Sequence, residues 1–104
     1  MRRTSEIEET APVEPEHVHL NNHHRDTLEK IFRHPTSHNI EWLDVLSLLE
    51  VVGIVNEGHD GKYVVILGSE TETFERPKQK DVAIQVVIDL RRMLRGAGYG
   101  GDGD

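Results

Sequence analysis

The hydrophobic pattern changes its period at Gly53, and this change constrains the fold more than any other feature of the sequence. From Glu41 to Val51, large apolar side chains recur at helical spacing, which predicts an amphipathic helix that Gly53 terminates. From Lys62 to Leu67 they form a short β-branched run, which predicts a strand. A chain with both patterns needs a helix layer and a sheet layer around one core.

Three β-rich runs predict the strands of an antiparallel meander; they cover residues 54–59, 62–67 and 71–76. Asp60-Gly61 predicts a two-residue type I′ turn between the first two strands, and Gly68-Ser69 predicts the next tight turn. Both alternating sets of the central strand are apolar, so helices on one face leave the other in need of a cover. The candidates for that cover are residues 25–33, a second copy of the chain and a partner protein.

Two further helices flank this unit. Asp26 is the expected N-cap of a short helix that ends before Pro35. Asp81 is the expected N-cap of a last helix that runs to about Arg95. The inward stripe of that last helix is expected to comprise Ala83, Val87, Leu90, Leu94 and Ala97. The predicted fold class is therefore α+β, a three-stranded antiparallel meander with helices on one face, preceded by an extra N-terminal helix.

The length of 104 residues allows one small domain. Residues 1–22 predict a disordered acidic tail that contains histidines, residues 23–99 the domain, and residues 100–104 a flexible Gly/Asp tail. No apolar run is long enough for a transmembrane helix, and the N-terminus lacks the apolar stretch of a signal peptide, so we expect a cytoplasmic protein. The absence of cysteine excludes disulfides and thiolate metal sites.

The formal net charge of −7 argues against a globally basic nucleic-acid binder, but the cations are segregated. Residues 76–95 hold six Lys/Arg against two Asp/Glu. Such a cluster can neutralise phosphates, or it can be a solvated helix face. The residues of this candidate RNA-binding face are Lys62, Arg76, Lys78, Lys80, Arg91, Arg92 and Arg95.

One pair of residues is a candidate for catalysis. A two-residue turn would place His59 directly opposite Lys62 on one face of the hairpin, and a nearby ammonium favours the neutral imidazole that a general base requires. The alternative is an exposed polar pair at a turn. The other histidines have no carboxylate or cysteine at a spacing that completes a zinc site, so we expect no metal and no cofactor.

Several segments together resemble the HicA toxin family. They are residues 42–53, the hairpins, Glu75-Arg76-Pro77-Lys78 and the closing run Leu90-Arg91-Arg92-Met93-Leu94-Arg95-Gly96-Ala97-Gly98-Tyr99. The resemblance covers about residues 25–99 and is closest to divergent bacterial members. It implies a double-stranded-RNA-binding-like αβββα fold, mRNA cleavage, and neutralisation by a HicB antitoxin.

Family toxins carry Gly-Ser-His at the head of the second strand, with the histidine as the catalytic group. The matching positions here are Asp60, Gly61 and Lys62, so lysine replaces histidine, and lysine is a poor base near neutral pH. We therefore expect a non-catalytic HicA-like domain that binds RNA or a protein partner through its basic face. The alternatives are an active mRNA interferase of a toxin–antitoxin system, using His59 or Lys62, and a protein-interaction or dimerisation module that uses the open sheet face.

Overall fold

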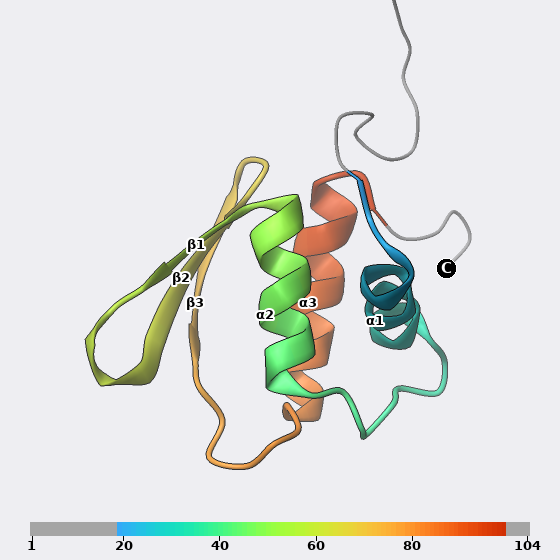
Figure 1. Ribbon diagram of the computed structural model, residues 1–104, viewed down its shortest axis with the longest axis horizontal. Coiled ribbons are helices and arrows are strands. Elements are labelled where there is room, and N and C mark those ends of the chain that lie inside the picture. The colour runs from blue at the N-terminus through green and yellow to red at the C-terminus, as the bar shows by residue number, and fades with distance from the viewer. Residues whose placement is uncertain (1–18, 100–104) are drawn as a thin grey trace, which may run out of the picture.

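Within the described part of the chain, three α-helices and three strands follow one another in the order that the sequence predicts (Figure 1). The computed structural model describes residues 19–99. The elements are α1 (Asn22–Phe32), α2 (Trp42–Val52), β1 (Ile54–Glu57), β2 (Lys62–Leu67), β3 (Glu70–Glu75) and α3 (Ile84–Gly96). The structure is therefore α+β, as predicted. Within this described range, no helix is both long and apolar enough to cross a membrane.

The elements form three layers. The antiparallel sheet, in the order β1-β2-β3, packs against α2 and α3, and α1 lies on the opposite side of these two helices (Figure 1). Because α2 is sandwiched between the sheet and α1, it needs the wide apolar stripe seen in its sequence. The main buried side chains that join the layers are Ile31, Val45, Leu48, Leu49, Val65, Leu67, Val87, Leu90, Met93 and Leu94.

The position of α1 overturns one expectation. Residues 25–33 were a candidate cover for the second face of the sheet, but α1 packs on the helix layer instead. The inner face of β2 is buried through Tyr63, Val65 and Leu67, whereas Val64 and Ile66 on the outer face are half-buried. Among the described residues, the outer face of the sheet therefore has no helix over it.

The first helix begins earlier than predicted. Its N-cap is Asn21, whose side-chain oxygen accepts a hydrogen bond from the backbone N–H of His24 at 2.8 Å. Asp26 lies inside the helix, so the expected N-cap was wrong. The buried stripe includes the polar residues His24 and Thr27, which a search for apolar periodicity cannot find. Leu20 is also buried, so the domain begins before residue 23; the rest of the predicted N-terminal tail and residues 100–104 lie outside the described residues.

The last helix begins later than predicted. Its N-cap is Ala83, which offers no side-chain hydrogen bond. Asp81, the expected N-cap, is held in an isolated antiparallel bridge with Glu41. This bridge keeps the backbone extended up to Ala83, which is exposed and does not belong to the inward stripe. Met93 is buried in that stripe instead.

Gly53 ends α2 because two segments of the chain approach each other closely there, and not because the position needs a special backbone angle. A Cβ atom at this position would lie 2.4 Å from the carbonyl oxygen of Ile66 and 2.8 Å from Cδ1 of Leu67. The absence of a side chain lets β1 leave the helix directly against β2. The predicted helix stop is therefore confirmed, and its reason is steric.

Candidate functional site

The hairpin between β1 and β2 differs from the prediction by one residue. The register pairs Glu57 with Tyr63, and Gly58 donates a backbone hydrogen bond to Lys62 at 2.7 Å, so His59–Gly61 form a three-residue loop. Asp60 has φ 63° and Gly61 has φ 72°, both in the left-handed region.

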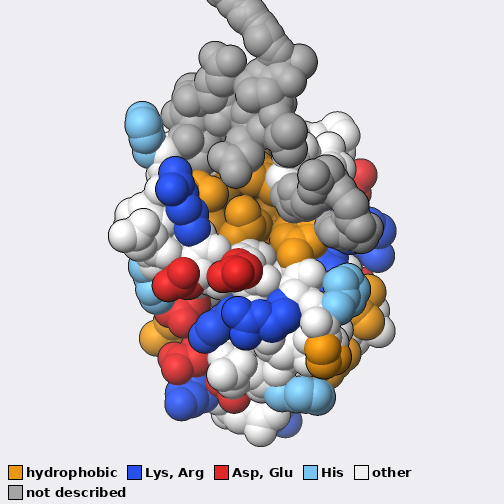
Figure 2. Space-filling view, turned by 90° about the vertical axis from the view of Figure 1, so that its right-hand side faces the viewer, with side chains coloured by type: hydrophobic (Ala, Val, Ile, Leu, Met, Phe, Trp, Pro, Cys, Tyr) orange, Lys and Arg blue, Asp and Glu red, His pale blue; other side chains and the backbone are white. Residues whose placement is uncertain are grey.

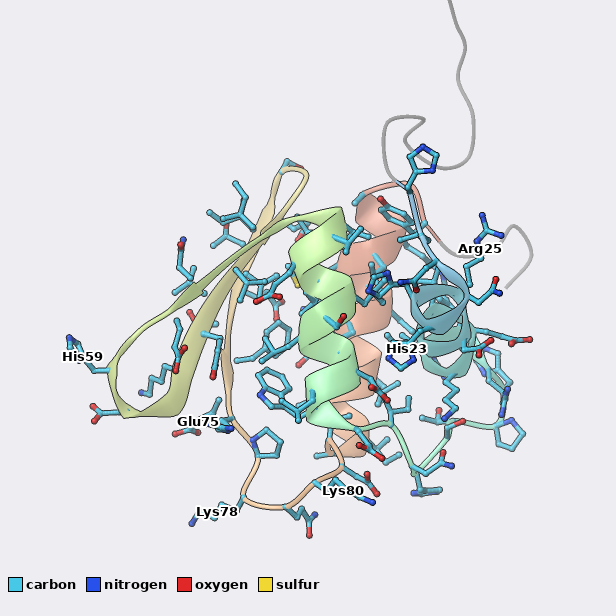
Figure 3. The ribbon with its side chains drawn as sticks, in the orientation of Figure 1. His23, Arg25, His59, Glu75, Lys78 and Lys80 are labelled. Atoms are coloured by element: carbon cyan, nitrogen blue, oxygen red, sulfur yellow. The ribbon has the colours of Figure 1, made fainter. Side chains whose placement is uncertain are left out.

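The predicted juxtaposition of His59 and Lys62 is therefore wrong. His59 lies in the loop and points away from the body of the molecule (Figure 3). The cross-strand neighbour of Lys62 is Glu75 on β3. The extra loop residue removes the geometry on which general-base chemistry at His59 was expected, because no lysine faces the imidazole across the hairpin.

The chain between β3 and α3, residues 76–83, is fixed at both ends by backbone hydrogen bonds. At the first end, the N–H of Arg76 donates to the carbonyl of Gly61 at 2.8 Å, which ties the loop to the hairpin. At the second end, the N–H of Trp42 donates to Lys80 at 3.0 Å, and a matching bond joins residues 82 and 40. The 76–83 loop is therefore an arch that backbone hydrogen bonds anchor near both ends.

A cavity of about 520 Å³ lies under this arch, between the hairpin loop and the first turn of α3. Its volume falls within the roughly 300–1,000 Å³ typical of ligand pockets. We call it the loop cavity; it is lined by Trp42, Asp60, Glu75, Arg76, Pro77, Lys78, Val82, Ala83 and Val86. Five of these side chains are apolar and four are charged, a mixture typical of sites that hold an apolar group and orient it by polar contacts.

Trp42 forms part of the apolar lining of the loop cavity. It is only 4% exposed and meets the ring of Tyr63 edge-on at a centroid distance of 5.3 Å. Its indole Nε1 has no hydrogen-bond partner among the described residues. A buried donor of this kind usually finds an acceptor, so its vicinity is a place where an additional polar group would be stabilised.

The charges around the loop cavity are mixed, and of the nearby cations Lys80 forms an ion pair. Lys80 lies 3.7 Å from Glu41, and Glu75 is the cross-strand neighbour of Lys62. Figure 3 shows Lys78 and Lys80 projecting outward from the arch. Arg76 and Lys78 line the cavity together with two acidic residues. The four charged side chains that line the cavity are therefore balanced, with Arg76 and Lys78 against Asp60 and Glu75.

The three arginines of α3 do not join this surface. Arg91 donates from Nε to the carbonyl of Ile31 at 2.6 Å, and from a terminal nitrogen to the carbonyl of Arg33 at 2.8 Å and the hydroxyl of Thr36 at 3.0 Å. It therefore holds the C-terminal end of α1. Its neighbour Arg95 stacks on the ring of Phe32, with 5.4 Å from the guanidinium carbon to the ring centre.

Arg92 points the other way, toward the sheet. It forms ion pairs with Glu72 on β3 and with Asp89 one turn earlier on α3. The hydrogen bond to Glu72, together with the negative charge of that carboxylate, raises the pKa of Arg92 above its usual range. The predicted basic face is thus divided: Lys62, Arg76, Lys78 and Lys80 gather at one end of the sheet, whereas the helix arginines bind other parts of the fold.

Among the described residues, the side of the molecule that carries α1 shows no continuous basic surface. In Figure 2, Lys/Arg and Asp/Glu side chains alternate over this face. Two histidines of α1 are instead used to contact α2: His23 lies 3.0 Å from a carboxylate oxygen of Asp44, and His24 lies 2.9 Å from the hydroxyl of Ser47. Between residues 19 and 99, no group of three or more His, Asp or Glu side chains is placed to hold a metal ion.

Comparisons with protein-family models, with curated proteins and with solved structures found no match.

Proposed function

We propose that this chain is a non-catalytic protein-binding module whose loop cavity receives a short segment of a partner protein. The observation that carries the proposal is the cavity itself, where an apolar lining of Trp42, Val82 and Val86 lies beside the exposed cations Arg76 and Lys78. An apolar side chain of the partner enters the cavity, and an acidic side chain next to it meets the two cations.

Two features favour an acidic segment. Arg76 and Lys78 line the cavity and form no ion pair with another described residue, so both can meet an acidic side chain, while Asp60 and Glu75 supply the balancing negative charge of the lining. In addition, α3 begins at the cavity without an acidic residue in its first turn and without a side-chain cap, so its positive dipole end adds to the same field.

RNA binding is the second candidate, and one observation favours it. Lys62, Arg76, Lys78 and Lys80 are all exposed and lie at the same end of the sheet. Phosphate binding along a strand of RNA requires a track of unpaired cations. Here acidic side chains alternate with the cations, and the helix arginines are bound elsewhere, so a single acidic segment fits the surface better than a polyanion.

Membership of the HicA toxin family remains a prediction, and it would supply a candidate for the partner protein. A HicB-like antitoxin is a protein, and a chain of this family with lysine at the motif position would keep protein binding while losing RNA cleavage. The proposal accordingly gives His59 and Lys62 no catalytic role and places the protein in the cytoplasm beside such a partner. An mRNA interferase activity would contradict it.

The proposal is tested by following the backbone amide signals of the ¹⁵N-labelled full chain during peptide titration. The probe is a capped peptide with the sequence Glu-Leu-Glu-Leu, and the matched controls carry Gln or Lys in place of Glu. We expect shifts concentrated in residues 60–62 and 76–86, in the order acidic, then neutral, then basic peptide. No shift in these segments at millimolar acidic peptide would overturn the proposal.

A second measurement separates the two candidates. Fluorescence anisotropy of labelled single-stranded and double-stranded RNA is followed at low and high salt, and the same samples are run on a denaturing gel. We expect weak binding and intact RNA. Tight binding that weakens steeply with salt and is lost in Lys78→Glu would favour RNA instead, and cut RNA that becomes intact in His59→Ala would restore the enzyme hypothesis.

A further inference from the structure

The outer face of the sheet is a second surface, which shares only Glu75 with the lining of the loop cavity. Antiparallel pairing places its residues in rows across the three strands: Ile54, Ile66 and Thr71; then Asn56, Val64 and Thr73; then Lys62 and Glu75. We call these eight residues the outer sheet face. Ile54 is 56% exposed, and the apolar side chains of the first two rows are contiguous.

Within the described chain, no element covers this face. The helices α2 and α3 pack on the inner side of the sheet, and α1 lies beyond them (Figure 1). Ile54, Val64 and Ile66 form a contiguous apolar patch on this uncovered face, and such patches mark contact surfaces. We propose that the outer sheet face binds a second copy of this chain and forms a weak, two-fold symmetric dimer.

Charge is the first argument for a second copy as the occupant. The whole chain carries a formal net charge of −7, so two copies repel one another over most approaches. The outer sheet face is an exception, because its charged side chains are Lys62 and the directly opposed Glu75, whose charges cancel. Two copies therefore approach with the least repulsion through this face.

The arrangement of the rows is the second argument. When the first two rows of one copy pack on those of another, the row with Lys62 and Glu75 lies at the rim, where both charges keep their water. An approach through the strand edges is disfavoured, since β1 carries Glu57 and β3 carries Glu70 and Glu72, and paired edges would bring these carboxylates together.

The size of the face sets the expected strength. Strands about 4.8 Å apart and a rise of about 3.4 Å per residue give a face of roughly 14 Å by 20 Å for three strands with a six-residue centre. This is below the roughly 800 Å² per partner of a standard stable interface. The dimer is therefore weak and forms only at high protein concentration.

The test is sedimentation equilibrium of the full chain from low micromolar to millimolar concentration, at about 0.05 M and 0.5 M NaCl. We expect a reversible monomer–dimer equilibrium that tightens roughly two- to five-fold at high salt, because salt screens the repulsion between two acidic copies. An ion-paired interface would weaken instead. A monomer at every concentration and at both salts would overturn the proposal and leave the face to a different protein.

Substitutions locate the contact. Ile54→Lys and Thr73→Lys lie on the two edge strands, where an exposed lysine does not disturb the core, and each is expected to raise the dissociation constant about tenfold or more. The matched control is Leu43→Lys, which changes a 64% exposed side chain on α2, the helix on the inner side of the sheet, and leaves the dimer unchanged. Dimers that persist in both sheet variants would refute the assignment of the face. The outcome is independent of the loop cavity, because none of the three substituted residues lines it.

Discussion

Arg91→Ala removes the side chain that fastens α1 to the rest of the domain. The three hydrogen bonds from its guanidinium end on the carbonyls of Ile31 and Arg33 and the hydroxyl of Thr36, with lengths between 2.6 and 3.0 Å. A hydrogen bond to a charged group contributes about 1.5–3 kcal/mol, but these acceptors lie near the surface and recover water when the arginine is lost. We therefore expect the free energy of unfolding to fall by about 2–3 kcal/mol in total, less than the sum of three bonds.

The assay is urea denaturation and thermal melting followed by circular dichroism. For a domain of this size, the expected loss corresponds to a melting temperature about 8–24 °C lower. The control is Arg92→Ala, which breaks exposed ion pairs with Glu72 and Asp89 and should cost far less. If the Arg91→Ala and Arg92→Ala variants have the same melting temperature, Arg91 does not hold α1, and the packing of α1 on the helix layer through this contact is wrong.

Two further substitutions test local geometry by the same melting assay. Gly53→Ala places a Cβ 2.4 Å from the carbonyl oxygen of Ile66 and should destabilise the domain by about 1–3 kcal/mol. The control is Gly58→Ala, where the nearest atom to the new Cβ is 3.5 Å away, and this variant should be nearly neutral. Equal melting temperatures of the two variants would refute the close approach at Gly53. Asp60→Val forces a β-branched residue into the left-handed region at φ 63° and should cost about 1–2 kcal/mol, while Asp60→Gly should be neutral or slightly stabilising; the reverse order would contradict the loop geometry.

The order of the elements was predictable because each carries its own periodic signal. The change of period at Gly53 separates helix from sheet, and the residues of the central strand that alternate between its two faces are apolar on both faces, which marks it as a strand. Helix beginnings were less predictable. Asn21 caps a helix whose buried stripe starts with His24 and Thr27, and Asp81 is drawn into a bridge with Glu41, a contact forty residues distant in the chain.

The candidate site was predictable only in part. Lys78 and its neighbours in the 76–83 loop do lie together, because they follow one strand and a short connection. The sequence could not show that Arg91 points toward α1 and Arg92 toward the sheet, since adjacent helical positions differ by about 100° and depend on how α3 packs. The sequence also could not show the loop cavity, because three segments that are distant in the sequence enclose it. The bracing bond between Arg76 and Gly61 carries no local signal.

The central claim is that Arg76 and Lys78 hold an acidic segment at the loop cavity, and a charge exchange tests it most directly. The affinities of the capped Glu-Leu-Glu-Leu peptide and its Lys counterpart are measured for the natural chain and for Lys78→Glu. Arg25→Glu serves as the control, because Arg25 is exposed on α1, far from the arch (Figure 3). The account predicts that Lys78→Glu reverses the preference between the two peptides and that Arg25→Glu leaves it unchanged. An unchanged preference in Lys78→Glu, or an equal response in both variants, would contradict it.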